Sequence, residues 1–224
     1  MTKETLLRYI DFDADYEESR AKFYMDMKGV ALHIKVLNYL GFEFCDGNKI
    51  KWKVVSEKLS QDKLLRDKLY IYLATLEEYM RAYIANKYSD DVRQDFWING
   101  VGKRNQIKDK VLNGKELFDI LEDADFGTLI KQVINLPCSD KEELFGGKGT
   151  EQNIIAVREL RNAVSHHKFM FSREFLNCSV DGIETNSLEN NIKNLRQLLP
   201  VQYRYGENGK GGITADMKKC SINL

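Results

Sequence analysis

The chain has 224 residues, 43% of them hydrophobic and 30% charged, and its 34 basic and 34 acidic residues leave no net charge. This composition supports a packed core and excludes wholesale disorder. It also excludes a uniformly basic nucleic-acid-binding protein, so any anion site must come from a local arrangement of cations. The two prolines exclude the collagen-like and proline-rich classes.

The N-terminal sequence and the cysteines indicate a cytoplasmic protein. Residues 1–8 (MTKETLLR) lack the apolar segment of a signal peptide, and no apolar run approaches the roughly 18 residues that span a bilayer. The cysteines are far apart: Cys45, Cys138, Cys178 and Cys220. Because neither they nor the three histidines show metal-ligand spacing, we expect free thiols, no metal, no cofactor and no membrane contact.

In the first half of the chain, residues 17–40 predict an amphipathic helical segment that Gly41 ends. Residues 49–55 (KIKWKVV) alternate with period two and predict either one short strand or an extended arm, without an obvious partner. Residues 48–99 contain neither glycine nor proline and predict a long helix.

The second half of the chain predicts further helices. A second stretch without glycine or proline covers residues 150–181. In both long stretches apolar residues recur at spacings of three and four, as at Leu69, Leu73, Leu76 and Met80, and at Ile154, Val157, Leu160 and Val164. Shorter amphipathic segments cover residues 106–112, 116–121, 129–136 and 188–199. The chain therefore predicts an all-α bundle.

Three parts of the chain are expected. Residues 1–60 form an N-terminal helical extension, residues 61–200 the main bundle, and residues 201–224 a short C-terminal tail behind a glycine-rich joint. Residues 103–115 carry five bases against one acid, so Lys103 and Arg104 are candidate phosphate contacts. An ordinary solvated helix face explains the same charges.

One constellation carries recognisable chemistry. Asn162 and His166 are four residues apart and stack on one helix face, and the long side chain of Arg161 can reach the same rim. An imidazole moves protons near neutral pH, and a guanidinium grips phosphate oxygens. Together they suit RNA cleavage by the neighbouring 2′-hydroxyl without a metal. Alternatively, the histidine only complements a helix dipole.

The run Arg161-Asn162-(three residues)-His166 resembles the R-N-x-x-x-H signature of the HEPN superfamily. These helical-bundle ribonucleases occur in abortive-infection and toxin–antitoxin systems and in type VI CRISPR effectors. The likeness covers roughly residues 62–175. Residues 76–81 (LEEYMR) and 126–129 (FGTL) also resemble the Abi-like, abortive-infection branch.

The resemblance implies a role for each motif residue. Arg161 would bind the scissile phosphate and stabilise the transition state, and His166 would act as general acid or base. Asn162 would orient His166 or cap the local geometry. In the superfamily two motifs face each other across a dimer. Because this chain has one motif, the resemblance implies a homodimer with a composite site, acting as a toxin in phage defence. An antitoxin or sensing partner would restrain it.

Further candidates surround the motif. His167, Lys168 and Arg173 could extend an RNA-binding rim, and Glu77 or Glu78 could fix the rotamer of Arg161. Alternatively, Glu77 forms an ordinary i,i+4 pair with Arg81.

Two other motifs have simpler interpretations. Residues 145–150 (FGGKGT) lack phosphate-loop spacing and predict a loop in which Thr150 caps the next helix. His33, among apolar neighbours, is interpreted as a partly buried histidine without a catalytic role.

Two alternatives to the nuclease remain open at the level of sequence. In one, the bundle is a non-catalytic HEPN-like module that binds RNA or protein, with Arg161 as a phosphate grip. In the other, it is a structural scaffold in which Arg161 and His166 are ordinary polar groups. RNA cleavage distinguishes the nuclease from both.

Overall fold

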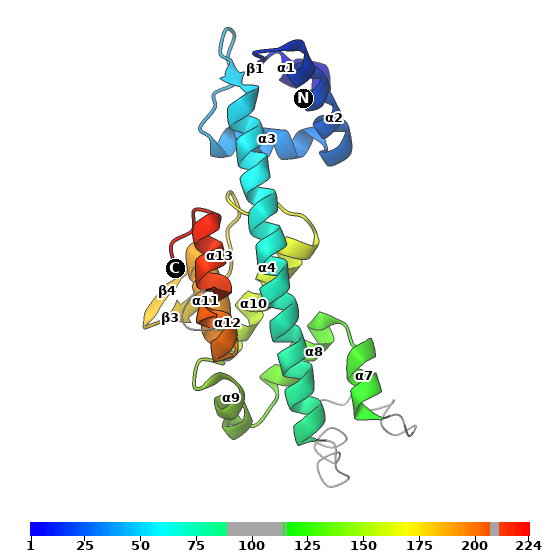
Figure 1. Ribbon diagram of the computed structural model, residues 1–224, viewed down its shortest axis with the longest axis vertical. Helices are drawn as coiled ribbons and strands as arrows, with labels where there is room; N and C mark the ends of the chain where they lie inside the picture. The colour runs from blue at the N-terminus through cyan, green and yellow to red at the C-terminus, as the bar shows by residue number, and fades with distance from the viewer. Residues whose placement is uncertain (89–113, 115, 207–210) are drawn as a thin grey trace. The chain divides into compact units, whose positions relative to one another are not determined.

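The computed structural model describes residues 1–88, 114, 116–206 and 211–224 (Figure 1). Of these residues, 66% are helical and 5% lie in strands, which confirms the predicted all-α class. No helix in the described ranges is long and apolar enough to cross a membrane. The predicted helix at residues 106–112 lies outside them.

The chain divides into two compact units. The first comprises Met1–Asp67 and Ala163–Glu174, and the second comprises Lys68–Asn162 and Phe175–Leu224. The first unit contains α1 (Lys3–Leu7), β1 (Ile10–Asp11), α2 (Asp15–Lys28), α3 (Val30–Tyr39), β2 (Ile50–Lys51) and the start of α4 (Trp52–Lys87). Its core consists of buried apolar side chains, among them Leu6, Met25, Leu37, Trp52 and Phe169.

Two details of the first unit differ from the sequence prediction. The helical segment at residues 17–40 is interrupted at Gly29, whose φ of 84° ends α2 and starts α3. The alternating segment at residues 49–55 forms a strand only at Ile50–Lys51, because Trp52 already begins α4. The partner that the sequence did not reveal is β1, which pairs with β2 in parallel.

The second unit contains the rest of α4 and the following helices and strands. These are α7 (Leu117–Asp123), α8 (Phe126–Ile134), α9 (Cys138–Phe145), α10 (Glu151–Ser165), β3 (Cys178–Val180), β4 (Ile183–Thr185), α11 (Leu188–Leu198), α12 (Val201–Tyr205) and α13 (Gly212–Lys219). The last three residues of α10, after Asn162, belong to the first unit. The apolar stripe predicted for α4 is buried, since Leu69, Leu73, Leu76 and Met80 are almost inaccessible to solvent. This burial explains why α4 is one continuous helix.

Buried amides join three elements of the second unit. The Asn153 side chain, in the first turn of α10, donates to the backbone oxygens of Lys148 and Ser179, both at 3.0 Å. Its Oδ1 accepts from the Ser179 N–H at 2.9 Å. From α11, the Asn194 amide donates to the Asn153 backbone oxygen at 2.8 Å. These bonds fix the start of α10 against β3 and α11. The strand β3 and the helix α11 pack side by side (Figure 1).

The C-terminal residues contain two helices. α12 and α13 pack together (Figure 1), and α13 buries Ile213 and Met217. Asp216 of α13 accepts a hydrogen bond from the Tyr72 hydroxyl of α4 at 2.9 Å. Residues 211–224 therefore belong to the packed second unit, whereas residues 207–210 lie outside the described ranges.

Candidate active site

Helix α10 carries Arg161 and Asn162, and His166 directly follows its last residue, Ser165. Thr150 caps its start, as predicted, because the Thr150 hydroxyl accepts from the Asn153 N–H at 3.2 Å. Ile154, Val157 and Leu160 are buried and anchor one face of the helix in the core of the second unit. The helix therefore has a fixed rotation about its axis in this unit, and Arg161 and Asn162 are only half-buried.

The Arg161 guanidinium contacts two neighbouring side chains and remains partly exposed. Its central carbon lies 5.2 Å from the ring centroid of Phe126, a cation–π contact. Its Nη2 lies 3.8 Å from Oε2 of Glu77, which is too long for a hydrogen bond. The side chain remains 34% exposed. Its fork of donors is therefore open to an anionic ligand.

Of the two candidate glutamates, Glu77 is the one near Arg161. It also accepts a hydrogen bond from Arg81 at 2.5 Å, so both predicted pairings of Glu77 occur together. Arg81 in turn donates to the Ala124 backbone oxygen at 2.7 Å. Glu78, by contrast, is exposed. The Glu77 carboxylate thus lies between the guanidinium groups of Arg81 and Arg161.

Among the residues that the structure describes, Asn162 lacks a side-chain partner. Its side chain is half-buried, and its amide makes no hydrogen bond within the described part of the chain. Its orienting role therefore stays a prediction.

The helix predicted over residues 150–181 is shorter than the sequence suggested, because α10 ends at Ser165. The Lys168 N–H donates to the Ala163 oxygen at 2.9 Å, and the His167 N–H donates to the Val164 oxygen at 3.1 Å. His167 itself has a φ of 51°. These features define a Schellman C-cap with His166 as the capping residue and His167 in the left-handed position that glycine usually fills.

A buried ion pair in the first unit holds the segment after α10. Nδ1 of His167 lies 2.9 Å from Nη1 of Arg66, and the Arg66 Nε donates to Asp62 at 2.9 Å. The other Asp62 oxygen accepts the Met170 N–H at 2.7 Å. Asp62 and Arg66 are both buried. Burial raises the pKa of Asp62, whereas the Met170 N–H and Arg66 oppose that rise.

Asp62 and Arg66 were not among the residues that the sequence singled out. Arg66 lies 101 residues before His167, so spacing along the chain cannot connect them. One sequence feature could have indicated this pair: Asp62 and Arg66 are four residues apart, next to the apolar Leu65 and Leu69. Both leucines are buried, and a solvated ion pair is not expected beside them.

The remaining candidates around the motif differ in exposure. His166 and Lys168 are exposed, and neither side chain forms a hydrogen bond or ion pair within the described residues. Arg173 is half-buried. The exposed imidazole and ammonium can meet a ligand without first breaking a contact. Lys103 and Arg104 lie outside the described ranges.

Two further expectations concern metal ligands and His33. Residues 1–88, 114, 116–206 and 211–224 contain no group of three or more histidine, cysteine or acidic side chains that could hold a metal ion. His33 is fully buried, and its Nδ1 lies 3.0 Å from the Gly29 oxygen.

The motif contains two kinds of reactive group, each described within its own unit. In the second unit the Arg161 side chain is one-third exposed, and in the first unit the His166 imidazole is exposed. A guanidinium stabilises a phosphate oxyanion, and an imidazole transfers a proton. Comparisons of the chain with protein-family models, curated proteins and solved structures find no match.

Proposed function

We propose that the protein is a metal-independent endoribonuclease of the HEPN type, with a composite active site formed across a homodimer. We further propose that it acts in the cytoplasm as a toxin in abortive-infection defence and that an antitoxin or sensing partner restrains it. One observation carries the proposal: the R-N-x-x-x-H motif occupies the end of α10, with Arg161 one-third exposed and His166 exposed.

The reaction uses a proton transfer at each end of the scissile phosphodiester. A base removes the proton of the 2′-hydroxyl, and O2′ attacks phosphorus. The P–O5′ bond breaks, and an acid protonates the departing O5′. The products carry a 2′,3′-cyclic phosphate and a 5′-hydroxyl. Arg161 stabilises the extra negative charge of the pentacoordinate intermediate.

The need for two proton-transfer groups supports the dimer. A single imidazole cannot be proton-free as a base and protonated as an acid in the same step. One chain has one motif, so two copies of His166 together supply both groups. A light-scattering mass of twice the 26.0 kDa chain is expected for the active species.

Incubation of purified protein with total RNA tests the proposal. Wild type should cleave RNA in EDTA, and Arg161→Ala and His166→Ala should lose the activity while keeping their helical content and dimeric mass. Arg158→Ala is the matched control, because Arg158 lies on α10 about one turn before Arg161 and is paired with Glu159. Cleavage that survives in both motif variants, or that requires a divalent ion, contradicts the proposal.

A further inference from the structure

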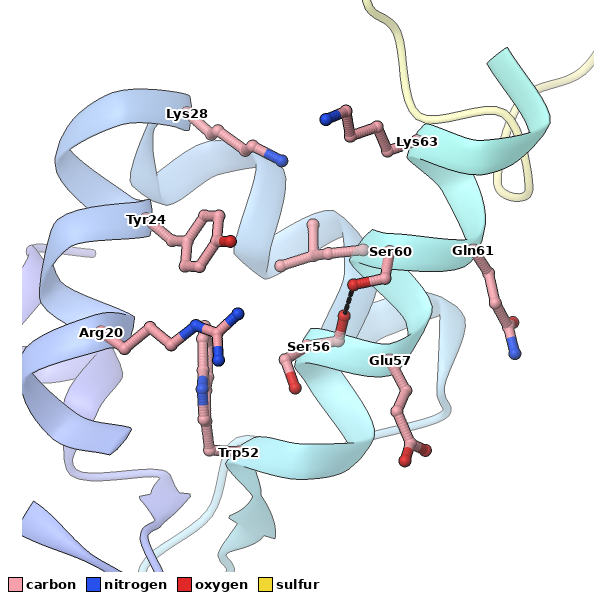
Figure 2. Close-up of a pocket in the computed structure, with 10 residues that line it drawn as sticks. Arg20, Tyr24, Lys28, Trp52, Ser56, Glu57, Ser60, Gln61 and Lys63 are labelled. Carbon is pink, nitrogen blue, oxygen red and sulfur yellow. Dashed lines mark hydrogen bonds between the residues drawn. The ribbon is translucent and has the colours of Figure 1, made fainter. Parts of the chain in front are cut away.

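The first unit contains a cleft of about 320 Å³ between α2 and the start of α4 (Figure 2). Arg20, Tyr24 and Lys28 lie four residues apart and project from one face of α2 toward α4. On the opposite wall, Ser60 and Lys63 follow Trp52 along α4. All the residues that line this cleft belong to the first unit.

Two cations contact one phenol in this cleft, and a third points into the same space. The Arg20 guanidinium carbon lies 5.7 Å from the Tyr24 ring centroid, and the Lys28 Nζ lies 5.2 Å from it. Figure 2 shows the Lys63 ammonium directed into the same space from α4. A hydrogen bond from Arg20 lowers the pKa of Tyr24, and the charges of Arg20, Lys28 and Lys63 lower it further. The three positive charges therefore face one space.

In the described part of the chain no carboxylate forms a salt bridge with these cations, although the charge of Asp62 acts on Lys28. Within the described residues, none of Arg20, Lys28 and Lys63 forms an ion pair, whereas the neighbouring Lys22 on α2 is paired with Glu18 at 2.7 Å. Glu57 is the one acid that lines the cleft, and its side chain points away from the three cations (Figure 2). Three like charges held around one space repel each other unless an anion joins them.

The rest of the cleft is suited to a ring. Trp52 and Leu59 are buried and give it an apolar base. The Tyr24 ring is only half-buried, so part of its surface remains open to stacking. The hydroxyls of Ser56 and Ser60 donate to backbone oxygens at 3.0 and 2.8 Å, which leaves their lone pairs as acceptors. The volume lies at the lower end of the range for small-molecule sites.

We propose that this cleft binds a nucleotide, with its phosphate held by Arg20, Lys28 and Lys63 and its base against Tyr24. The nucleotide is either free or one unit of an RNA strand, since both present the same phosphate and ring. The site does not depend on the proposed cleavage activity, because its residues contain none of the motif.

Calorimetric titration of the full chain tests the site. The His166→Ala variant is used so that RNA is not consumed. The probes are adenosine 5′-monophosphate, adenosine, inorganic phosphate and a short oligoadenylate. The monophosphate should bind at least about tenfold more tightly than adenosine, because the charged contacts need the phosphate. Tighter binding of the oligoadenylate than of the monophosphate identifies an RNA strand as the ligand, and the reverse order identifies a free nucleotide.

Variants of the cleft complete the experiment. Arg20→Met and Lys63→Met should each weaken binding of the monophosphate by roughly tenfold, and both positions are exposed, so folding should be kept. Lys53→Met removes the same charge from an exposed position on α4 outside the cleft and should change nothing. Equal binding of adenosine and the monophosphate, equal affinities in all three variants, or no binding of any phosphate overturns the proposal.

Discussion

Nη1 of Arg66 lies 2.9 Å from Nδ1 of His167 and joins α4 to the residues that follow α10 within the first unit. A guanidinium can only donate hydrogen bonds, so Nδ1 must accept. His167 is therefore neutral in this arrangement and carries its proton on Nε2. The contact fixes the residue next to His166, and it rests on the buried Asp62 that pairs with Arg66.

Nitrogen NMR of His167 should show this tautomer directly. At pH 7.5 we expect Nδ1 to have the chemical shift of an unprotonated ring nitrogen and Nε2 that of a protonated one. In the Arg66→Met variant the two tautomers should both be populated. A protonated Nδ1 in the wild-type protein contradicts the hydrogen bond.

Asp62 and Arg66 should be energetically coupled. Arg66→Met should lower the free energy of unfolding by about 3 kcal/mol, because it leaves the Asp62 carboxylate buried without its counter-charge. Asp62→Asn keeps an acceptor for the Met170 N–H, so the double variant should lose clearly less than the sum of the two single losses. Urea denaturation of the four proteins gives the coupling. Additive losses within about 0.5 kcal/mol show that the pair is not coupled.

The helices with clear apolar periodicity could be predicted, whereas α9, the β3–β4 hairpin, the helices of the C-terminal tail and the long-range pairings could not. The apolar periodicity of α4 and α10 locates their buried faces because the burial of one stripe stabilises each helix. The end of α10 was missed because His167, not glycine, takes the left-handed position of the cap. Arg66 was missed because its partner is distant along the chain. The motif itself was visible because all its residues lie within one turn and a half of a single helix.

The polar face of α11 is a second limit of sequence reasoning. Asn190, Asn191 and Asn194 are buried, although asparagine is mostly exposed in proteins. Their burial is supported by hydrogen bonds such as that from Asn194 to the Asn153 oxygen. Such bonds depend on backbone groups of other elements, which no spacing along α11 reveals.

Asn153 should be essential for the stability of the second unit. Asn153→Ala removes three side-chain hydrogen bonds and leaves the Ser179 N–H and two carbonyl groups without that partner. We expect the free energy of unfolding to fall by about 3 kcal/mol, measured by urea denaturation. Glu189→Ala on α11 is a control with little expected effect, because Glu189 is exposed. Equal stability of the Asn153→Ala and wild-type proteins contradicts the structure.

His33 should make the first unit less stable in acid. Burial lowers the pKa of His33 below its ordinary value of 6.5, so the unfolded chain binds the proton more readily. Stability is then lost as the pH falls below about 6.5, by at most about 1.4 kcal/mol per pH unit.

Trp52 stacks on His33 with ring centroids 6.1 Å apart and reports on this region. Its fluorescence is read in a Trp97→Phe background during urea denaturation at pH 7.5 and 5.5. The loss of stability between the two pH values should be smaller in His33→Gln than in the parent protein. The same loss in both proteins assigns the acid sensitivity to other groups.

The proposed nuclease requires Arg161 and His166 to act on one RNA phosphodiester. A map of RNA ends in cells expressing the wild-type chain or the His166→Ala variant at equal levels tests this requirement. The proposed function predicts new ends bearing a 2′,3′-cyclic phosphate and a 5′-hydroxyl with the wild-type chain alone. The same new ends with both chains, or none with the wild type, contradict it.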